Sequence, residues 1–113
     1  MTSGLRPAPR RGEIWLAQLD KVRPVVILTR DPLGSYLNAV IVGPITSTIR
    51  GLATEVAVGA VDGVRVASVV NLDNLQLLDR VHLRRKVGRA TPTTLDAICG
   101  AVAIAIGCDE VRP

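Results

Sequence analysis

The sequence predicts an α+β domain in which a strongly curved antiparallel sheet, or a small barrel, is closed by one C-terminal helix. Short runs rich in Val and Ile, separated by turn residues, fill most of the chain. After position 91 the apolar residues recur instead at the three- and four-residue spacing of a helix. With 113 residues, 48% of them hydrophobic, the chain suits one compact core and is too short for two.

The first two predicted strands form a hairpin. Residues 13–19 begin with strand-forming Ile14 and Trp15, and the apolar run 24–29 starts after only four more residues. That second run and the next one, 39–45, are apolar on both faces, which is typical of central strands covered on each side. The turn formers between these two runs are Pro32, Gly34 and Asn38.

Two further strands are predicted in the middle of the chain. Residues 54–58 follow a break at Gly51, and residues 64–72 follow the Asp62-Gly63 dipeptide, which is a strong hairpin signal. We therefore expect an antiparallel sheet built from successive hairpins.

The last element is predicted to be one amphipathic helix that ends at Gly107. Thr91 followed by Pro92 is an N-cap with proline in the first helical position. We expect Gly100 to allow close packing on the sheet, and Cys99 and Cys108 to be reduced core thiols. The expected apolar face comprises Leu95, Ile98, Cys99, Val102 and Ile106.

The domain organisation is expected to be simple. Residues 1–11 contain two prolines and three arginines and are predicted to be a flexible basic arm, and residues 12–113 form a single domain. The longest uncharged apolar window, residues 97–108, is shorter than the roughly 18 to 20 residues needed to cross a bilayer. Because the basic N-terminus lacks the apolar segment of a secretory signal, we expect a cytoplasmic protein without membrane contact.

The charge balance favours an anionic partner. Lys and Arg number 14 against 10 acids, and 12 of the 14 are Arg, whose planar guanidinium binds phosphate oxygens through two donors. A basic surface that only maintains solubility is the alternative. With two Cys and one His at no zinc-binding spacing, we expect no metal site and no cofactor.

Four segments of the chain resemble a known family in their order and spacing. They read RRGEIWLAQLD from Arg10, RPVVILTRD from Arg23, IVGPITSTIRG from Ile41 and VVNLDNLQLL from Val69, and a helix follows. This succession, from Arg10 to about Gly107, resembles the MazF/PemK-type toxin endoribonucleases. The resemblance implies a small SH3-like barrel with a C-terminal helix. It also implies that the arginine of R-P and the threonine of P-I-T, here Arg23 and Thr46, are the catalytic pair.

The chemistry of these residues agrees with the resemblance. RNA is cut without a metal by its own 2′-hydroxyl if charge on the phosphorane is neutralised and protons are moved. Arg23 offers two parallel donors to a phosphate, and Thr46 adds a hydroxyl donor. The alternative is a solvated strand-edge arginine and a turn-forming threonine. Because an arginine side chain stays protonated, Arg23 is a poor general base. The candidate general bases are Asp20 and Glu55, each of which is otherwise an ordinary surface acid.

Polar residues around this pair are predicted to bind RNA. Those beside the motifs also suit turns, and the cations after position 80 also suit a solvated face. The lone His82 is expected to be a surface histidine. The candidate RNA-binding residues are Lys21, Ser47, Thr48, Arg50, Asn74, Arg84, Arg85 and Lys86.

The resemblance implies the toxin of a toxin–antitoxin pair. It implies a metal-independent endoribonuclease that leaves a 2′,3′-cyclic phosphate and a 5′-hydroxyl, acts as a homodimer and is inhibited by an acidic antitoxin protein. A non-catalytic toxin of the CcdB type, which binds and poisons DNA gyrase, is the alternative function.

Overall fold

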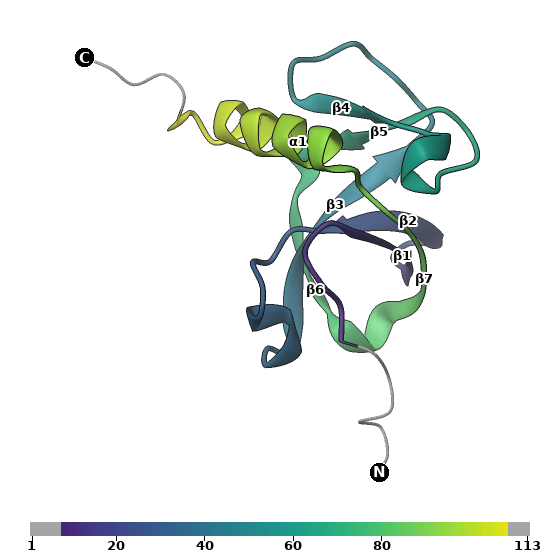
Figure 1. Ribbon diagram of the computed structural model, residues 1–113, viewed down its shortest axis with the longest axis vertical. Helices are drawn as coiled ribbons and strands as arrows, with labels where there is room; N and C mark the ends of the chain where they lie inside the picture. The colour runs from purple at the N-terminus through teal and green to yellow at the C-terminus, as the bar shows by residue number, and fades with distance from the viewer. Residues whose placement is uncertain (1–7, 109–113) are drawn as a thin grey trace.

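The computed structural model describes residues 8–108 of the chain (Figure 1). Over this range the structure contains seven strands and one α-helix, with short 3₁₀ turns between several of them. No helix within it is long and apolar enough to span a membrane. The elements are β1 (Glu13–Gln18), β2 (Val22–Ile27), β3 (Ala39–Thr46), β4 (Glu55–Val58), β5 (Ser68–Asn71), β6 (Gln76–Asp79), β7 (Leu83–Arg89) and α1 (Pro92–Ala105).

The strands form one curved antiparallel sheet with β3 at its centre. The order is β4-β5-β3-β2-β1-β7, and β6 pairs with the first half of β3. The second half of β3 pairs with β5 through Ile45 and Thr46, so this one long strand joins two parts of the sheet. The path ends at β4 and β7, which makes the sheet open. The predicted α+β class, with a curved antiparallel sheet and a C-terminal helix, is confirmed.

Both faces of the sheet bury apolar side chains, as the two-sided apolar runs predicted. Neighbouring residues of a strand point to opposite faces. β1 therefore sends Ile14 into one core and Trp15 into the other, and β2 divides Val26 and Val25 in the same way. Strands held from both sides give the residues at their ends a rigid base.

The helix closes one of these cores. The Thr91 side chain caps α1 by accepting a hydrogen bond from the Thr94 amide at 3.1 Å, and Pro92 occupies the first turn. Ile98 and Ala101 are buried. The helix lies across the β4–β5 end of the molecule in Figure 1, where it packs on β4 and on the 3₁₀ turn Leu72–Asn74.

Some helical expectations were wrong. Cys99 and Cys108 are free but exposed, and the Cys99 Sγ accepts a hydrogen bond from Arg11 at 2.9 Å. Ile106 lies one residue past the helix and is 63% exposed. Gly100 is also exposed, and a Cβ built on it would meet nothing within 4 Å. The spacing predicted the helix correctly, but the face that is buried is narrower than the apolar stripe.

The last strand of the sheet, β7, was not predicted from the sequence. Residues 80–89 read as a solvated cationic run, yet most of them form β7, an edge strand paired with β1. Its Leu83 is buried at 2% exposure, whereas its cations are exposed. Charged side chains are typical of edge strands, where they discourage pairing with other chains. Of the predicted strand 64–72, only Ser68–Asn71 is extended in the sheet.

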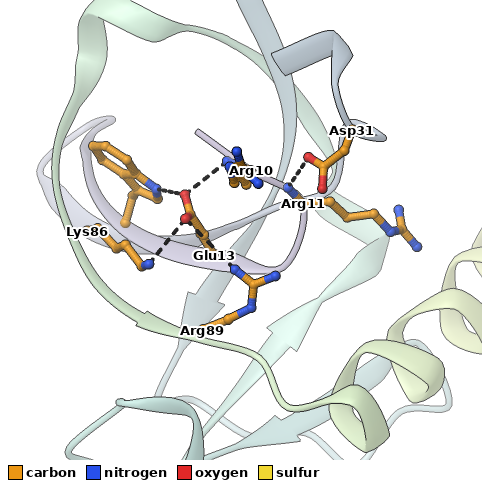
Figure 2. Close-up of polar contacts among 7 residues, drawn as sticks. Arg10, Arg11, Glu13, Asp31, Lys86 and Arg89 are labelled. Atoms are coloured by element: carbon orange, nitrogen blue, oxygen red, sulfur yellow. Dashed lines mark hydrogen bonds and ion pairs between the residues drawn. The ribbon is translucent and has the colours of Figure 1, made fainter. Parts of the chain in front are cut away.

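Glu13 joins the N-terminal turn to both β1 and β7 (Figure 2). Its carboxylate is buried and accepts hydrogen bonds from the Arg10 amide at 2.9 Å and the Trp15 indole at 3.1 Å. It also pairs with Lys86 Nζ at 3.2 Å and Arg89 at 3.9 Å. Burial alone would raise the pKa of Glu13, but these hydrogen bonds and the charge of Lys86 outweigh burial and hold the pKa below its ordinary value.

The predicted basic arm spans residues 1–11, and its first seven residues lie outside the described part of the chain. Of the remaining four residues, Pro9 is buried, and the Arg11 amide donates to Asp31 at 3.0 Å. The Arg11 guanidinium also reaches the Leu28 carbonyl at 2.9 Å. Residues 8–11 are therefore held against the domain.

A close backbone approach fixes the loop before β5 against β7. A Cβ placed on Gly88 would collide with the carbonyl oxygen of Asp62, and one on Gly63 would lie 2.8 Å from the Gly88 Cα. The buried Asp62 carboxylate secures the same loop, because it accepts hydrogen bonds from the Gly59 and Thr91 amides.

Gly88→Ala is expected to lower the free energy of unfolding by about 2 to 3 kcal/mol, because the added methyl forces two backbones apart. Urea denaturation measures this change. Gly100→Ala is the matched control, and it is expected to raise stability by about 0.5 to 1 kcal/mol because alanine favours an exposed helix position over glycine. Equal stability of Gly88→Ala and the wild type would contradict the steric argument.

Candidate functional site

A polar groove of about 790 Å³ opens where the ends of several strands meet. It lies beside the β1–β2 connection, the ends of β3 and β5, and the start of β4 and β6. Segments distant in sequence therefore contribute side chains to one hollow. The lining residues are Leu19, Asp20, Arg23, Pro44, Ile45, Thr46, Thr48, Arg50, Glu55, Asn71, Asp73, Asn74, Leu75 and Gln76.

Arg23 and Thr46 meet in this groove because of the register of β2 and β3. Val25 pairs with Pro44. Arg23 and Thr46 lie two residues beyond that pair on their respective strands, so both side chains project to the same face. The Thr46 hydroxyl oxygen accepts a hydrogen bond from the Thr48 amide at 3.1 Å, which leaves the hydroxyl proton available for donation.

Asp20 holds the guanidinium of Arg23 in a two-point contact. Arg23 Nε donates to Asp20 Oδ1 at 2.9 Å, and Arg23 Nη2 donates to Oδ2 at 3.2 Å. The tight turn between β1 and β2 is closed by a hydrogen bond from the Leu19 amide to the Lys21 carbonyl. It brings the Asp20 carboxylate next to Arg23, which follows three residues later. These hydrogen bonds from Arg23 lower the pKa of Asp20 to about 2, and Asp20 in turn raises the pKa of Arg23. Asp20 is thus a counter-ion, with a pKa far below that of an efficient general base near neutral pH.

Glu55 anchors the loop that follows β3. Its Oε1 accepts hydrogen bonds from three successive backbone amides, those of Arg50 at 3.0 Å, Gly51 at 2.8 Å and Leu52 at 3.2 Å. Gly51 has a φ of +75°, the left-handed conformation that lets consecutive N–H groups converge on one anion. The carboxylate therefore fixes the loop that carries Thr48 and Arg50, and its acceptor sites are engaged in the free chain.

The lining residues from Asn71 to Gln76 include three side-chain amides. Asn71 Oδ1 accepts from the Asp73 amide at 3.0 Å, and the Thr54 hydroxyl donates to Asp73 at 2.6 Å. Asn74, which was predicted from the sequence as an RNA-binding residue, lies in the lining, and so does Gln76, which was not singled out from the sequence. Gln76 enters the groove because β6 pairs with β3, and no local pattern in the sequence signals that pairing.

Three of the eight residues predicted to bind RNA line the groove. They are Thr48, Arg50 and Asn74, whereas Lys21 and Ser47 flank it in sequence without lining it. The other three, Arg84, Arg85 and Lys86, lie on β7, outside the lining. Lys86 is paired with Glu13, Arg84 donates to Gln18 at 3.0 Å, and Arg85 pairs in register with Leu16.

The groove is less basic than the composition of the chain predicted. Two arginines and three carboxylates are found among the lining residues that the structure describes. Each carboxylate has a partner inside the protein: Asp20 has Arg23, Glu55 has loop amides, and Asp73 has Thr54. Residues 8–108 contain no group of three or more His, Cys, Asp or Glu side chains arranged to hold a metal ion.

Comparison with known proteins identifies close relatives. Residues 10–106 match the family model described as PemK-like, MazF-like toxin of type II toxin-antitoxin system. Endoribonuclease MazF3 of Mycobacterium tuberculosis is 46% identical over 98 residues, which cover 87% of this chain and 95% of the relative. Probable endoribonuclease MazF2 of the same organism is 42% identical over 102 residues, with coverages of 88% and 99%.

Solved structures show the same architecture. Mycobacterium tuberculosis toxin MazF-mt6 superposes with a TM-score of 0.81 at 45% identity, over 84% of this chain and 96% of that one. An endoribonuclease in complex with its cognate antitoxin, from a mycobacterial species, superposes with a TM-score of 0.83 at 30% identity, over 94% and 100%.

The Asp20 carboxyl is expected to titrate near pH 2, below its ordinary value of 3.8. Because the shift is downward, the pair with Arg23 is complete above about pH 4 and is lost as the pH falls through about 2. The ¹³Cγ chemical shift of Asp20 reports this protonation by NMR, and Arg23→Met should move the midpoint back toward 3.8. Half-protonation at the ordinary value in the wild-type protein would show that the pair does not persist in solution.

Proposed function

This chain belongs to the PemK-like, MazF-like toxins of type II toxin–antitoxin systems, and from that premise we propose that it is a toxin endoribonuclease. Relatives named endoribonuclease match it over nearly their whole length, which supports the activity. We propose that it cuts RNA without a metal ion. The RNA's own 2′-hydroxyl oxygen attacks the adjacent phosphorus, and the bond to the 5′-oxygen breaks.

The observation that carries this proposal is the meeting of Arg23 and Thr46 in one groove. During the attack the 2′-hydroxyl loses a proton and negative charge builds on the non-bridging phosphate oxygens. A guanidinium with two parallel donors and a hydroxyl donor stabilise that charge. The departing 5′-oxygen gains a proton, so the products are a 2′,3′-cyclic phosphate and a 5′-hydroxyl. Arg23 and Thr46 are the proposed catalytic residues.

The two candidate general bases have different positions relative to this pair. Asp20 touches Arg23 directly, whereas Glu55 is turned toward the amides of residues 50–52. The contacts of Glu55 favour a positioning role for the loop. Asp20 is the acid nearer a phosphate held by Arg23, but its low pKa and its pair with Arg23 suit a counter-ion and not a general base.

We assign RNA recognition to the polar walls of the groove. Thr48 and Arg50 lie on the loop that Glu55 anchors, and Asn74 also lines the groove. Amide and hydroxyl groups read the exposed edges of unstacked bases. Lys21 and Ser47, at the rim, and the cations Arg84, Arg85 and Lys86, on β7, are proposed to add contacts to the RNA backbone outside the groove.

A CcdB-like toxin that binds gyrase is not favoured. The relatives that match most of this chain are named endoribonucleases, and the groove contains the arginine and threonine that the chemistry needs. Incubating the protein with total RNA separates the two functions, because a gyrase poison leaves RNA intact.

We propose that the toxin is a homodimer. Ile41 and Leu77 are directly paired across β3 and β6, and they are 45% and 71% exposed on the outer side of these strands. Leu37 and Val81 extend the exposed apolar surface on the adjacent turns. A patch of this kind favours pairing with a second copy around a two-fold axis.

We also propose an acidic antitoxin protein as the inhibitor and the cytoplasm as the location. A mycobacterial relative has been solved in complex with its cognate antitoxin, and a relative from Deinococcus radiodurans as MazE-MazF. The net charge of +4 favours an acidic partner, and the guanidinium groups of the groove suit carboxylates as well as phosphates.

Cleavage of RNA is expected to continue in EDTA, and Arg23→Ala and Thr46→Ala are each expected to lower its rate by about 10²- to 10³-fold. Mapping the 5′ ends of cleaved total RNA measures the activity, and circular dichroism checks the fold. Arg30→Ala, at an exposed arginine outside the groove lining, is the matched control and should retain the wild-type rate. Activity that disappears on chelation and returns with Mg²⁺ would refute the mechanism.

Light scattering at micromolar concentration is expected to give twice the 12.0 kDa mass of one chain. Leu77→Lys should shift the protein to the monomer, because it buries an ammonium in the proposed interface. Val66→Lys makes the same kind of change at a valine that is 64% exposed elsewhere, and it should leave the dimer intact. A wild-type protein that is monomeric under these conditions would contradict the dimer.

A further inference from the structure

One two-donor edge of the Arg23 guanidinium is already occupied in the free chain. Two of its nitrogens, Nε and Nη2, donate to the two oxygens of Asp20 at 2.9 Å and 3.2 Å. A carboxylate and a phosphate present two oxygens to a guanidinium in the same side-by-side geometry. A phosphate therefore gains the same two donors only if Asp20 leaves them.

We propose that Asp20 is an internal competitor for the phosphate site of Arg23, displaced each time an anion binds in the groove. This inference rests on the proposed function for its biological ligand, an RNA phosphate, but its physical content concerns Arg23 and any phosphate. Asp20 sets the affinity of the site by the free energy needed to break its own ion pair.

The position of Asp20 suits this exchange. Its side chain is 71% exposed on the turn between β1 and β2, whereas that of Arg23 is 34% exposed at the start of β2. Rotating an exposed side chain into water leaves no buried charge without a partner. Arg23 keeps its place because β2 is paired with β1 and β3, so the anion changes while the guanidinium stays.

The size of the effect is bounded by what such pairs contribute. Exposed ion pairs typically contribute a two- to fivefold preference for the paired state, roughly the range seen in double-mutant cycles. The competitor thus weakens phosphate binding by a similar factor. It also keeps other weak anions from occupying the site.

Binding of inorganic phosphate to the purified full-length protein tests this inference. The Arg23 Nε–Hε resonance and the Thr48 amide, followed by NMR during titration at neutral pH, give the Kd. Asp20→Asn removes the charge while keeping the size of the side chain, and we expect it to tighten phosphate binding by about two- to fivefold. In an Arg23→Ala background, the same substitution should produce no gain at the Thr48 amide, because the competition requires the guanidinium.

Two variants separate competition from a general change in charge. Asp96→Asn makes the same change in net charge on the exposed side of α1, and Asp73→Asn makes it in the groove at an acid whose partner is Thr54. Both should leave the Kd for phosphate within twofold of the wild-type value. A gain in Asp73→Asn equal to that in Asp20→Asn would overturn the proposal, because it would show that only the field in the groove matters. An unchanged Kd in Asp20→Asn would overturn it as well.

The outcome is separable from the proposed function. If Asp20→Asn tightens phosphate binding and the wild-type protein does not cut RNA, the competitor is supported and the ribonuclease is refuted. Cleavage of RNA with no change in phosphate affinity in Asp20→Asn would support the ribonuclease and refute the competitor.

Discussion

The position of the groove depends on the contacts that the buried Glu13 carboxylate makes. It connects three parts of the chain: the turn at Arg10, the indole of Trp15 and the edge strand through Lys86 and Arg89. A buried charge without partners would be costly, so these contacts require the N-terminal turn and β7 to stay in place together. β1 lies between β7 and β2, and β2 carries Arg23. The strand that positions the proposed catalytic arginine is thereby held on both sides.

Carboxylates organise the groove itself in the same manner. Glu55 holds the loop of residues 50–52, Asp73 accepts from Thr54, and Asp20 holds Arg23. These acids shape the walls and lower the net charge of a site that is proposed to bind a polyanion. Affinity for RNA then comes from a few directed donors in the groove and from cations around it, since the lining itself has more carboxylates than arginines.

Sequence reasoning found those features that local chemistry encodes. The Thr91-Pro92 cap defined the start of α1, the closely spaced apolar runs gave the β1–β2 hairpin, and the motifs identified Arg23 and Thr46. It missed what depends on pairing between distant segments. β7 looks like a solvated run because the cations of this edge strand are exposed, and Gln76 reaches the groove only through the pairing of β6 with β3. The pair between Lys86 and Glu13 likewise depends on the pairing of β7 with β1, and no local pattern in the sequence signals it.

The short β1–β2 connection links the fold of this chain to its chemistry. Only Leu19, Asp20 and Lys21 separate the two strands, so no long loop covers the groove from this side. The same shortness places a carboxylate three residues before Arg23, at the spacing that closes the two-point contact. A longer β1–β2 loop would have room to carry an acid to Arg23 and to move that acid out of the groove again. Here the counter-ion, Asp20, is part of the turn itself. An incoming phosphate therefore exchanges with a residue that stays within one side-chain rotation of the site. Because the groove is open, this exchange occurs in contact with water.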